Sequence, residues 1–152
     1  KYIYIQKLRY QNLFTYEAQV PGELLDAQIP KLILQPIVEN SVLHGIAERA
    51  EAGSILVTAS AADGDLMLAV CDDGIGMTPE KLTQLLSGDH LMSGCGSNHI
   101  GVYNVQERLR MLYGSGYGIT IESEPERYTR VYLRLPLKMG REETHCDEAC
   151  ID

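Results

Sequence analysis

Two short apolar runs joined by a tight turn constrain the fold of this chain most strongly. The runs cover residues 54–62 and 66–72, and the sequence Asp63-Gly64-Asp65 lies between them. Asp-Gly between two β-rich segments is a strong signal for a β-hairpin. The sequence therefore predicts two antiparallel strands that are adjacent along the chain.

The other segments place helices beside this hairpin. A second hairpin is predicted over 117–124 and 128–137, where apolar and polar residues alternate. Apolar residues at spacings of three and four predict a helix over 101–113, and a period-two pattern predicts a strand over 13–20. Thr78-Pro79-Glu80 is expected to open a further helix that runs to residue 86. Antiparallel strands beside segregated helices indicate a two-layer α+β sandwich rather than a parallel doubly wound sheet.

Residues 32–46 (LILQPIVENSVLHGI) predict a long helix, with Pro30 as a starting residue ahead of it. At about 100° per residue, one face of this helix is suited to burial. That face holds Leu34, Ile37, Val38, Ser41 and Gly45, and the polar residues Glu39, Asn40 and His44 gather on another side. Pro36 is expected to remove one hydrogen bond from the helix. Taken alone, such a helix is more often simply solvated on its polar side.

Size and charge limit the possible partners. A chain of 152 residues is large enough for one domain with a single core. The formal net charge of -8 argues against a nucleic-acid partner, because phosphate backbones are bound mainly by clustered Lys and Arg. A single nucleotide is not excluded, since backbone N–H groups, a helix N-terminus and a metal ion can offset its charge. The four cysteines lack a paired pattern, which favours reduced thiols and a cytoplasmic compartment.

Three parts of the chain are distinguished by their sequence. Residues 1–12 read as the end of a helix that enters from missing upstream sequence, because the chain begins at Lys1. Residues 13–138 form the expected folded domain. Residues 139–152 are acidic, lack periodicity and are expected to be disordered. No apolar run of about 18 residues predicts a membrane span in this fragment.

Two glycine-containing stretches indicate a nucleotide site, although no G-x-x-x-x-G-K-[ST] loop is present. Asp72, Gly74 and Gly76 form a D-x-G-x-G pattern where a strand ends. An acid there can accept a hydrogen bond from an exocyclic amine, and glycines let the backbone approach a flat ring. The Gly94-Cys95-Gly96 loop precedes the helix at residue 101, whose N-terminus suits a phosphate. A plain turn and a flexible connector are the alternatives.

Together these elements resemble the sensor histidine kinases, and within them the LytS/YesM-like group. That family shares its ATPase domain with the type II topoisomerases, a heat-shock chaperone and the mismatch-repair ATPases. Residues 36–45 (PIVENSVLHG) match the N box, residues 72–77 (DDGIGM) the first glycine box, and residues 100–105 (IGVYNV) with Arg108-Leu109 the second. The resemblance runs from about residue 2 to 137. It implies an α+β fold of the Bergerat ATPase type, with a mixed, mostly antiparallel sheet and helices on one face.

The resemblance also implies a role for each matched residue. Asn40 would hold the Mg²⁺ that bridges the triphosphate oxygens of ATP, and Glu39 would be the catalytic base. Asp72 would accept a hydrogen bond from the adenine amine. This discriminates against guanine, because the O6 of guanine is itself an acceptor. The other implied nucleotide-binding residues are His44, Gly74, Gly76, Met77, His99, Ile100, Gly101, Val102 and Asn104. Residues 88–99 would form the ATP lid.

The function implied by the resemblance is that of the ATP-binding catalytic domain of a two-component sensor histidine kinase. Such a domain transfers the γ-phosphate of ATP to a histidine on a separate phosphoacceptor helix, and a response regulator is the next partner. None of the four histidines lies in an H-F-x-x-N context, so this chain is expected to bind ATP without phosphorylating itself. The full-length protein would be a membrane-anchored homodimer with this domain in the cytoplasm, and the fragment a monomer.

Two departures keep alternatives open. Leu43 stands where relatives usually have a basic residue, and His99 stands where they usually have glycine. One alternative is therefore a degenerate domain that senses a nucleotide or scaffolds a dimer. Another is a serine kinase that inhibits a sigma factor, against which the helical lead-in over 2–12 argues. A zinc site at residues 145, 146 and 150 is not favoured, because the tail offers no scaffold.

Overall fold

A mixed sheet of five strands organises the domain. The computed structural model describes residues 2–9, 13–47, 49, 52–87 and 100–140. The strands are β1 (Phe14–Gln19), β2 (Gly53–Ala62), β3 (Asp65–Asp72), β4 (Gly118–Glu124) and β5 (Tyr128–Pro136). Their order in the sheet is β1-β2-β3-β5-β4, with β1 parallel to β2 and every other pair antiparallel. The prediction of a mixed, mostly antiparallel sheet is confirmed.

Both predicted hairpins are present. In the β2–β3 turn, Asp63 has a φ of 53° and Gly64 a φ of 83°, so both central residues adopt the conformation of a primed turn. The second hairpin joins β4 to β5, and its register pairs Glu124 with Tyr128. The two hairpins meet along β3 and β5, which the sequence patterns did not specify. This pairing brings the end of β3 beside the start of β5, where the candidate site lies.

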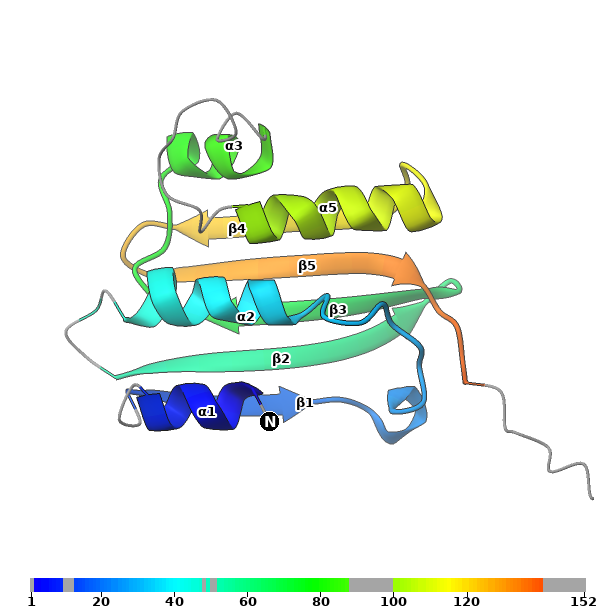
Figure 1. The fold of residues 1–152 in the computed structure, drawn as a ribbon, viewed down its shortest axis with the longest axis horizontal. Helices are drawn as coiled ribbons and strands as arrows, with labels where there is room; N and C mark the ends of the chain where they lie inside the picture. The colour runs from blue at the N-terminus through cyan, green and yellow to red at the C-terminus, as the bar shows by residue number, and fades with distance from the viewer. Residues whose placement is uncertain (1, 10–12, 48, 50–51, 88–99, 141–152) are drawn as a thin grey trace, which may run out of the picture.

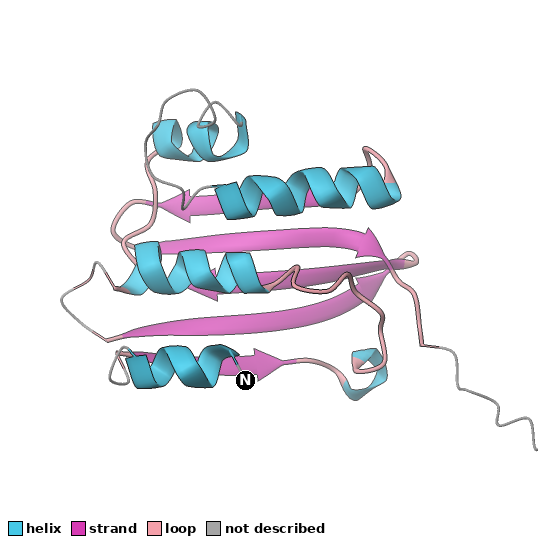
Figure 2. Ribbon diagram, in the orientation of Figure 1, coloured by secondary structure: helices cyan, strands magenta, loops and turns pink. Residues whose placement is uncertain are grey.

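Helices α1, α2 and α5 lie over one face of the sheet, and α3 lies beyond α5, past the β4 edge (Figures 1 and 2). The described helices are α1 (Tyr2–Arg9), α2 (Gln35–Asn40), η2 (Ser41–Ile46), α3 (Pro79–Ser87) and α5 (Ile100–Tyr113), with a short 3-10 turn, η1, at Gly22–Leu24. Val57, Val70 and Val131 lie side by side across β2, β3 and β5 and are buried on the helical side. They share a core with Ile37 and Leu109 of the helices, and each of the five loses nearly all its exposure to solvent. The two-layer α+β architecture is confirmed.

The central helix differs from its prediction at both ends. It begins at Gln35 rather than near Pro30, because the backbone at Leu32 adopts a left-handed φ of 62°, which a right-handed helix cannot include. The Leu32 side chain is exposed. Pro36 therefore lies in the first turn, where a backbone N–H has no partner within the helix in any case. The expected loss of a hydrogen bond at Pro36 is wrong for that reason. The burial prediction is better, since Ile37, Val38 and Ser41 are buried and Leu34 is half-buried.

The second half of this helix is a π-helix, η2, which periodicity did not predict. The Ala47 amide donates to the Val42 carbonyl at 2.9 Å, a bond that spans five residues instead of four. The wider turn leaves the Gly45 carbonyl available to a loop on the opposite side of the site, and the Ile75 amide donates to it at 2.9 Å. Segments of π-helix occur frequently at functional sites.

The described chain continues two residues past the expected domain boundary at 138. Met139 forms a β-bridge with Ala27, and the Gly140 amide donates to the Asp26 carbonyl at 2.9 Å. The tail from 141 onward and the expected lid at 88–99 lie outside the described residues, as do the three tail residues at which a zinc site was not favoured. Among the residues described, no helix is long and apolar enough to cross a bilayer.

Candidate functional site

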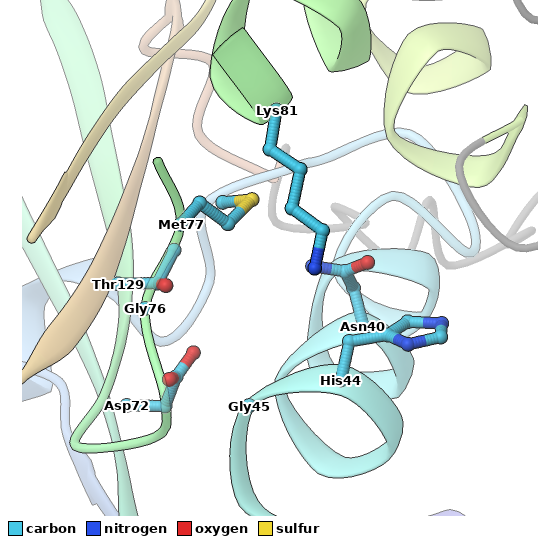
Figure 3. A pocket seen from close by; sticks show the side chains of 8 residues that line it. All are labelled: Asn40, His44, Gly45, Asp72, Gly76, Met77, Lys81 and Thr129. Carbon is cyan, nitrogen blue, oxygen red and sulfur yellow. The ribbon is translucent and has the colours of Figure 1, made fainter. Parts of the chain in front are cut away.

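A pocket opens between the central helix and the end of the β2–β3 hairpin (Figure 3). One wall comes from α2 and η2, and the opposite wall comes from β3, the loop after it and β5. Its lining residues are Asn40, His44, Gly45, Asp72, Gly76, Met77, Lys81 and Thr129. The predicted carboxamide of the helix and the predicted acid of the hairpin therefore face the same cavity.

The helix wall presents Asn40 and His44, one turn apart. Asn40 is only 9% exposed, and its side-chain oxygen Oδ1 has no hydrogen-bond partner among the described residues. A buried amide oxygen without a partner is costly, so this atom is suited to accept a donor or a cation from a bound ligand. An amide oxygen is also a hard ligand of the kind that Mg²⁺ accepts. The Asn40 side chain therefore fits the metal role that the resemblance implies.

The opposite wall is the D-x-G-x-G loop, which is fixed on both sides by the fold. The Ile75 carbonyl accepts the Glu126 amide at 2.6 Å, in addition to the bond from the Ile75 amide to Gly45. The Met77 amide donates to Ser123 Oγ at 2.8 Å. The loop is thus tied to η2 and to the β4–β5 hairpin, so the position of Asp72 is set before any ligand binds.

The glycines of this loop serve packing more than ligand approach. A Cβ at Gly74 would overlap the backbone of Gly45, and one at Gly76 would overlap the Glu124 carbonyl. Gly76 also has a φ of 62°, which favours glycine. A Cβ at Gly45 would lie 2.7 Å from Oδ1 of Asp72. The sequence interpretation, in which these glycines make room for a flat ring, is therefore incomplete: they first let the loop and the helix touch.

Asp72 is the buried acid of the pocket. It is 4% exposed, and its Oδ1 accepts the Gly74 amide at 3.1 Å. Burial raises the pKa of Asp72 from 3.8 to about 6, against the opposing effect of hydrogen bonds from the Ser41 hydroxyl and the Gly74 amide. At neutral pH the group is therefore a desolvated carboxylate that would gain from a hydrogen-bond donor in the pocket.

The neighbouring acid, Asp73, has a structural role. Its two carboxylate oxygens accept the amide and the hydroxyl of Ser54 at 2.7 and 2.8 Å, and Arg49 lies 3.7 Å from Oδ1. These contacts hold the start of β2 against the loop. Two adjacent aspartates thus have different environments, and only Asp72 faces the pocket.

Besides Gly45, which the sequence pattern assigns to the buried face of the helix, two pocket residues were missed by sequence reasoning. Thr129 is paired with Asp72 across β5 and β3, is 4% exposed, and lies 3.0 Å from Ser123 through the two hydroxyls. Lys81 extends into the pocket from the first turn of α3 (Figure 3). Neither residue belongs to a motif. The Thr129 position follows from the register of β3 and β5, which no sequence pattern specified.

Several residues of the implied site are not among those that line this pocket. Glu39 does not line the pocket, and its Oε1 accepts the Gln35 side-chain amide at 2.9 Å. In the second glycine box, Val102 is 1% exposed and belongs to the core, and Asn104 is exposed. Ile100 begins α5. A Cβ at Gly101 would lie 3.1 Å from Pro36, so this glycine brings α5 close to α2. His99 is outside the described residues.

The geometry separates two chemical functions. At one end a buried carboxylate can accept a hydrogen bond from a planar amine, and at the other a buried amide oxygen can bind a hard cation. Among the described residues no group of three or more His, Cys, Asp or Glu side chains could hold a metal by itself. A cation bound at Asn40 would therefore take most of its ligands from the bound anion and water, as Mg²⁺ does with phosphates.

Comparisons with known proteins identify the family of this chain. Residues 26–139 match the family described as histidine kinase-, DNA gyrase B-, and HSP90-like ATPases. The chain is 36% identical over 135 residues to the sensor histidine kinase BtsS of Escherichia coli K12, a match that covers 89% of this chain and 22% of that protein. It is 28% identical over 137 residues to the sensor histidine kinase YesM of Bacillus subtilis, with 90% of this chain and 22% of that protein covered.

The fold is also similar to solved structures. The histidine kinase domain of the blue-light activated histidine kinase of Erythrobacter litoralis EL346 superposes with a TM-score of 0.57 at 17% identity, covering 89% of this chain and 57% of that one. The chain spans about a fifth of the length of the two curated relatives, 22% of each.

Proposed function

The chain belongs to the family of histidine kinase-, DNA gyrase B- and HSP90-like ATPases, within which its relatives are sensor histidine kinases of the LytS and YesM type, and from this we propose how its pocket works. The pocket binds Mg²⁺-ATP, with the adenine at Asp72 and the phosphates at Asn40. The observation that carries the proposal is that these two side chains line one cavity from opposite walls.

The adenine end depends on Asp72. An ionised carboxylate accepts hydrogen bonds only, so it pairs with the exocyclic amine of adenine and opposes the O6 acceptor of guanine. Oδ1 already accepts a hydrogen bond from the Gly74 amide, so the free acceptor positions of the carboxylate are left for the ligand. Thr129, whose hydroxyl lies on the neighbouring strand at the same level, supplies a second polar group at the base.

The phosphate end depends on Asn40. Its buried Oδ1 would be the protein ligand of Mg²⁺, which when bound neutralises negative charge on the phosphate oxygens. His44 lies one turn further along the same wall and adds a polar ring beside the phosphates. The amide oxygen of Asn40 orients the anion without adding a negative charge of its own.

We assign the proton-accepting role to Glu39, which precedes Asn40 on the helix. The Gln35 amide holds Oε1 at 2.9 Å and so fixes the carboxylate in one orientation. Oε2 is the atom that we assign to proton transfer from the attacking imidazole of the acceptor histidine. Glu39 lies outside the pocket wall, so the acceptor has to approach from the solvent side of α2.

The intact protein is proposed to be a histidine kinase. This chain supplies the ATP-binding domain, and the phosphoryl group passes to a histidine on a separate helical segment and then to a response regulator. We place the domain in the cytoplasm, where ATP is available, and propose a homodimeric intact protein because the acceptor segment of this family also dimerises. The 152-residue chain by itself is proposed to be a monomer that binds the nucleotide without transferring phosphate.

Two measurements test the proposal. Calorimetric titration of the 152-residue chain with a non-hydrolysable ATP analogue and Mg²⁺ should give one site per chain. Labelled ATP added together with a polypeptide that carries the acceptor helix should yield acid-labile, histidine-linked label. Binding without transfer to any acceptor would instead support the nucleotide-sensing alternative. No binding of an adenine nucleotide would contradict the proposal as a whole.

A further inference from the structure

The positive charge of the pocket comes from outside its two motifs. Among the lining residues that the structure describes, Lys81 is the one Lys or Arg, and Asp72 contributes a negative charge. The chain as a whole carries a formal charge of -8. Among the described lining residues, Lys81 therefore supplies the one Lys or Arg charge that a triphosphate would meet beside the proposed Mg²⁺, while the negative field of the chain opposes its approach.

We propose that Lys81 is a phosphate-binding residue of this site and contacts the β- or γ-phosphate of the nucleotide at the Asn40 end of the pocket. This inference rests on the proposed function, since it names a further ligand contact of the same site. Figure 3 shows the Lys81 side chain extending from α3 toward Asn40 and not toward Asp72. Because Asp72 marks the base end, this direction assigns the Lys81 ammonium group to the phosphates.

The position of Lys81 is set by two features of α3. Thr78 caps the helix, with its Oγ1 accepting the Lys81 amide at 3.4 Å. Leu85, one turn after Lys81, is 1% exposed and belongs to the core, and Leu82 packs against that core. Residues four apart lie on the same side of a helix, so the anchored Leu85 holds Lys81 at the edge of the pocket. Before a nucleotide binds, the amino group of a lysine on this helix can stay in water. Once a phosphate is present, the flexible stem lets the amino group reach it.

The test compares three variants of the 152-residue chain. Lys81→Met keeps the apolar stem and removes the charge, and Lys81→Arg keeps the charge. Lys31→Met removes one charge from an exposed lysine that does not line the pocket and serves as the matched control. Affinities for adenosine, ADP and a non-hydrolysable ATP analogue are measured by calorimetry with Mg²⁺, and a thermal melt of each variant confirms that it folds.

Lys81→Met is expected to weaken binding of the ATP analogue about 5- to 20-fold, as loss of one partly solvated charge-assisted hydrogen bond would. Adenosine affinity should not change, Lys81→Arg should restore most of the loss, and Lys31→Met should bind like the unaltered chain. The dependence of log affinity on log salt concentration should also become shallower for Lys81→Met alone. These changes separate a phosphate contact from a structural role, which would lower affinity for all three ligands.

Two results would overturn the inference. If the unaltered chain binds the ATP analogue and Lys81→Met binds it equally well, Lys81 is a solvated surface lysine and the proposed function stands without it. Equal losses for adenosine and the ATP analogue would show that Lys81 acts through the fold. If the unaltered chain binds no adenine nucleotide at all, the proposed function fails and this inference fails with it.

Discussion

Replacing Asp72 by asparagine is expected to stabilise the empty domain while removing its affinity for adenine nucleotides. Burial raises the pKa of this carboxyl from 3.8 to about 6. Each unit of difference between the folded and unfolded pKa values corresponds to 1.36 kcal/mol. Keeping Asp72 ionised therefore costs the folded state about 3 kcal/mol above pH 6. Asparagine carries no charge but has its own burial cost, so the net gain in Asp72→Asn should be about 1–3 kcal/mol.

The pH dependence identifies this effect. The folded state holds the Asp72 proton more tightly than the unfolded chain does, so the cost is absent below the unfolded pKa of 3.8 and is complete above about pH 6. The free energy of unfolding of Asp72→Asn, minus that of the unaltered chain, should therefore grow between pH 4 and pH 7. Urea denaturation at both pH values measures it. A difference that is constant with pH would refute the reasoning.

The same variant should lose nucleotide binding for a geometric reason. Oδ1 accepts the Gly74 amide, so the asparagine oxygen is expected to take that position and its NH₂ group to face the pocket. A donor would then meet the adenine amine, which is also a donor. Asp73→Asn is the matched control, because that acid bonds Ser54 outside the pocket and should leave affinity unchanged. Unchanged affinity of Asp72→Asn would remove the assignment.

Three further predictions follow from the same site. Asn40→Ala should weaken Mg²⁺-dependent binding of an ATP analogue more than metal-free binding, because the buried Oδ1 of Asn40 is the proposed ligand of Mg²⁺. Calorimetry with and without Mg²⁺ measures both affinities, and equal losses would count against this role. The affinity of the unaltered chain for adenine nucleotides should fall as the pH drops through about 6, by up to tenfold per pH unit, because protonation of Asp72 removes a hydrogen-bond acceptor. An affinity that stays constant between pH 5 and 8 would contradict this prediction. Gly74→Ala should lower the free energy of unfolding by about 1–3 kcal/mol or more, because the added Cβ would overlap backbone atoms of Gly45, which cannot rotate away as a side chain could. A thermal melt with an unchanged Tm would disprove this close contact.

The parts of the fold that depend on local chemistry were predictable from the sequence. Asp63-Gly64 formed its turn because the two residues accept positive φ, and the buried face of the central helix followed the apolar spacing around Ile37. The start of that helix was not predictable from Pro30, because Leu32 turns the chain into a left-handed conformation that no local pattern marks. The π-helical segment also depends on tertiary contacts, through the bond between Gly45 and Ile75.

The candidate site divides in the same way. Asn40 and Asp72 were identified because each lies in a motif, and the structure places both at one pocket. Thr129 and Lys81 were missed because each reaches the pocket only through a packing relation, the β3–β5 register for one and the anchoring of α3 for the other. Glu39 lies beside the pocket rather than in its wall, so its catalytic role remains a prediction.

The central claim is that Asp72 and Asn40 bind the two ends of one adenine nucleotide. Its most direct test is a calorimetric titration of the unaltered chain with a non-hydrolysable ATP analogue, with and without Mg²⁺, beside the matching GTP analogue. We predict a single site for the ATP analogue, tighter with Mg²⁺, and much weaker binding of the GTP analogue. Equal affinity for the two analogues, or an affinity for the ATP analogue that Mg²⁺ leaves unchanged, would contradict the account.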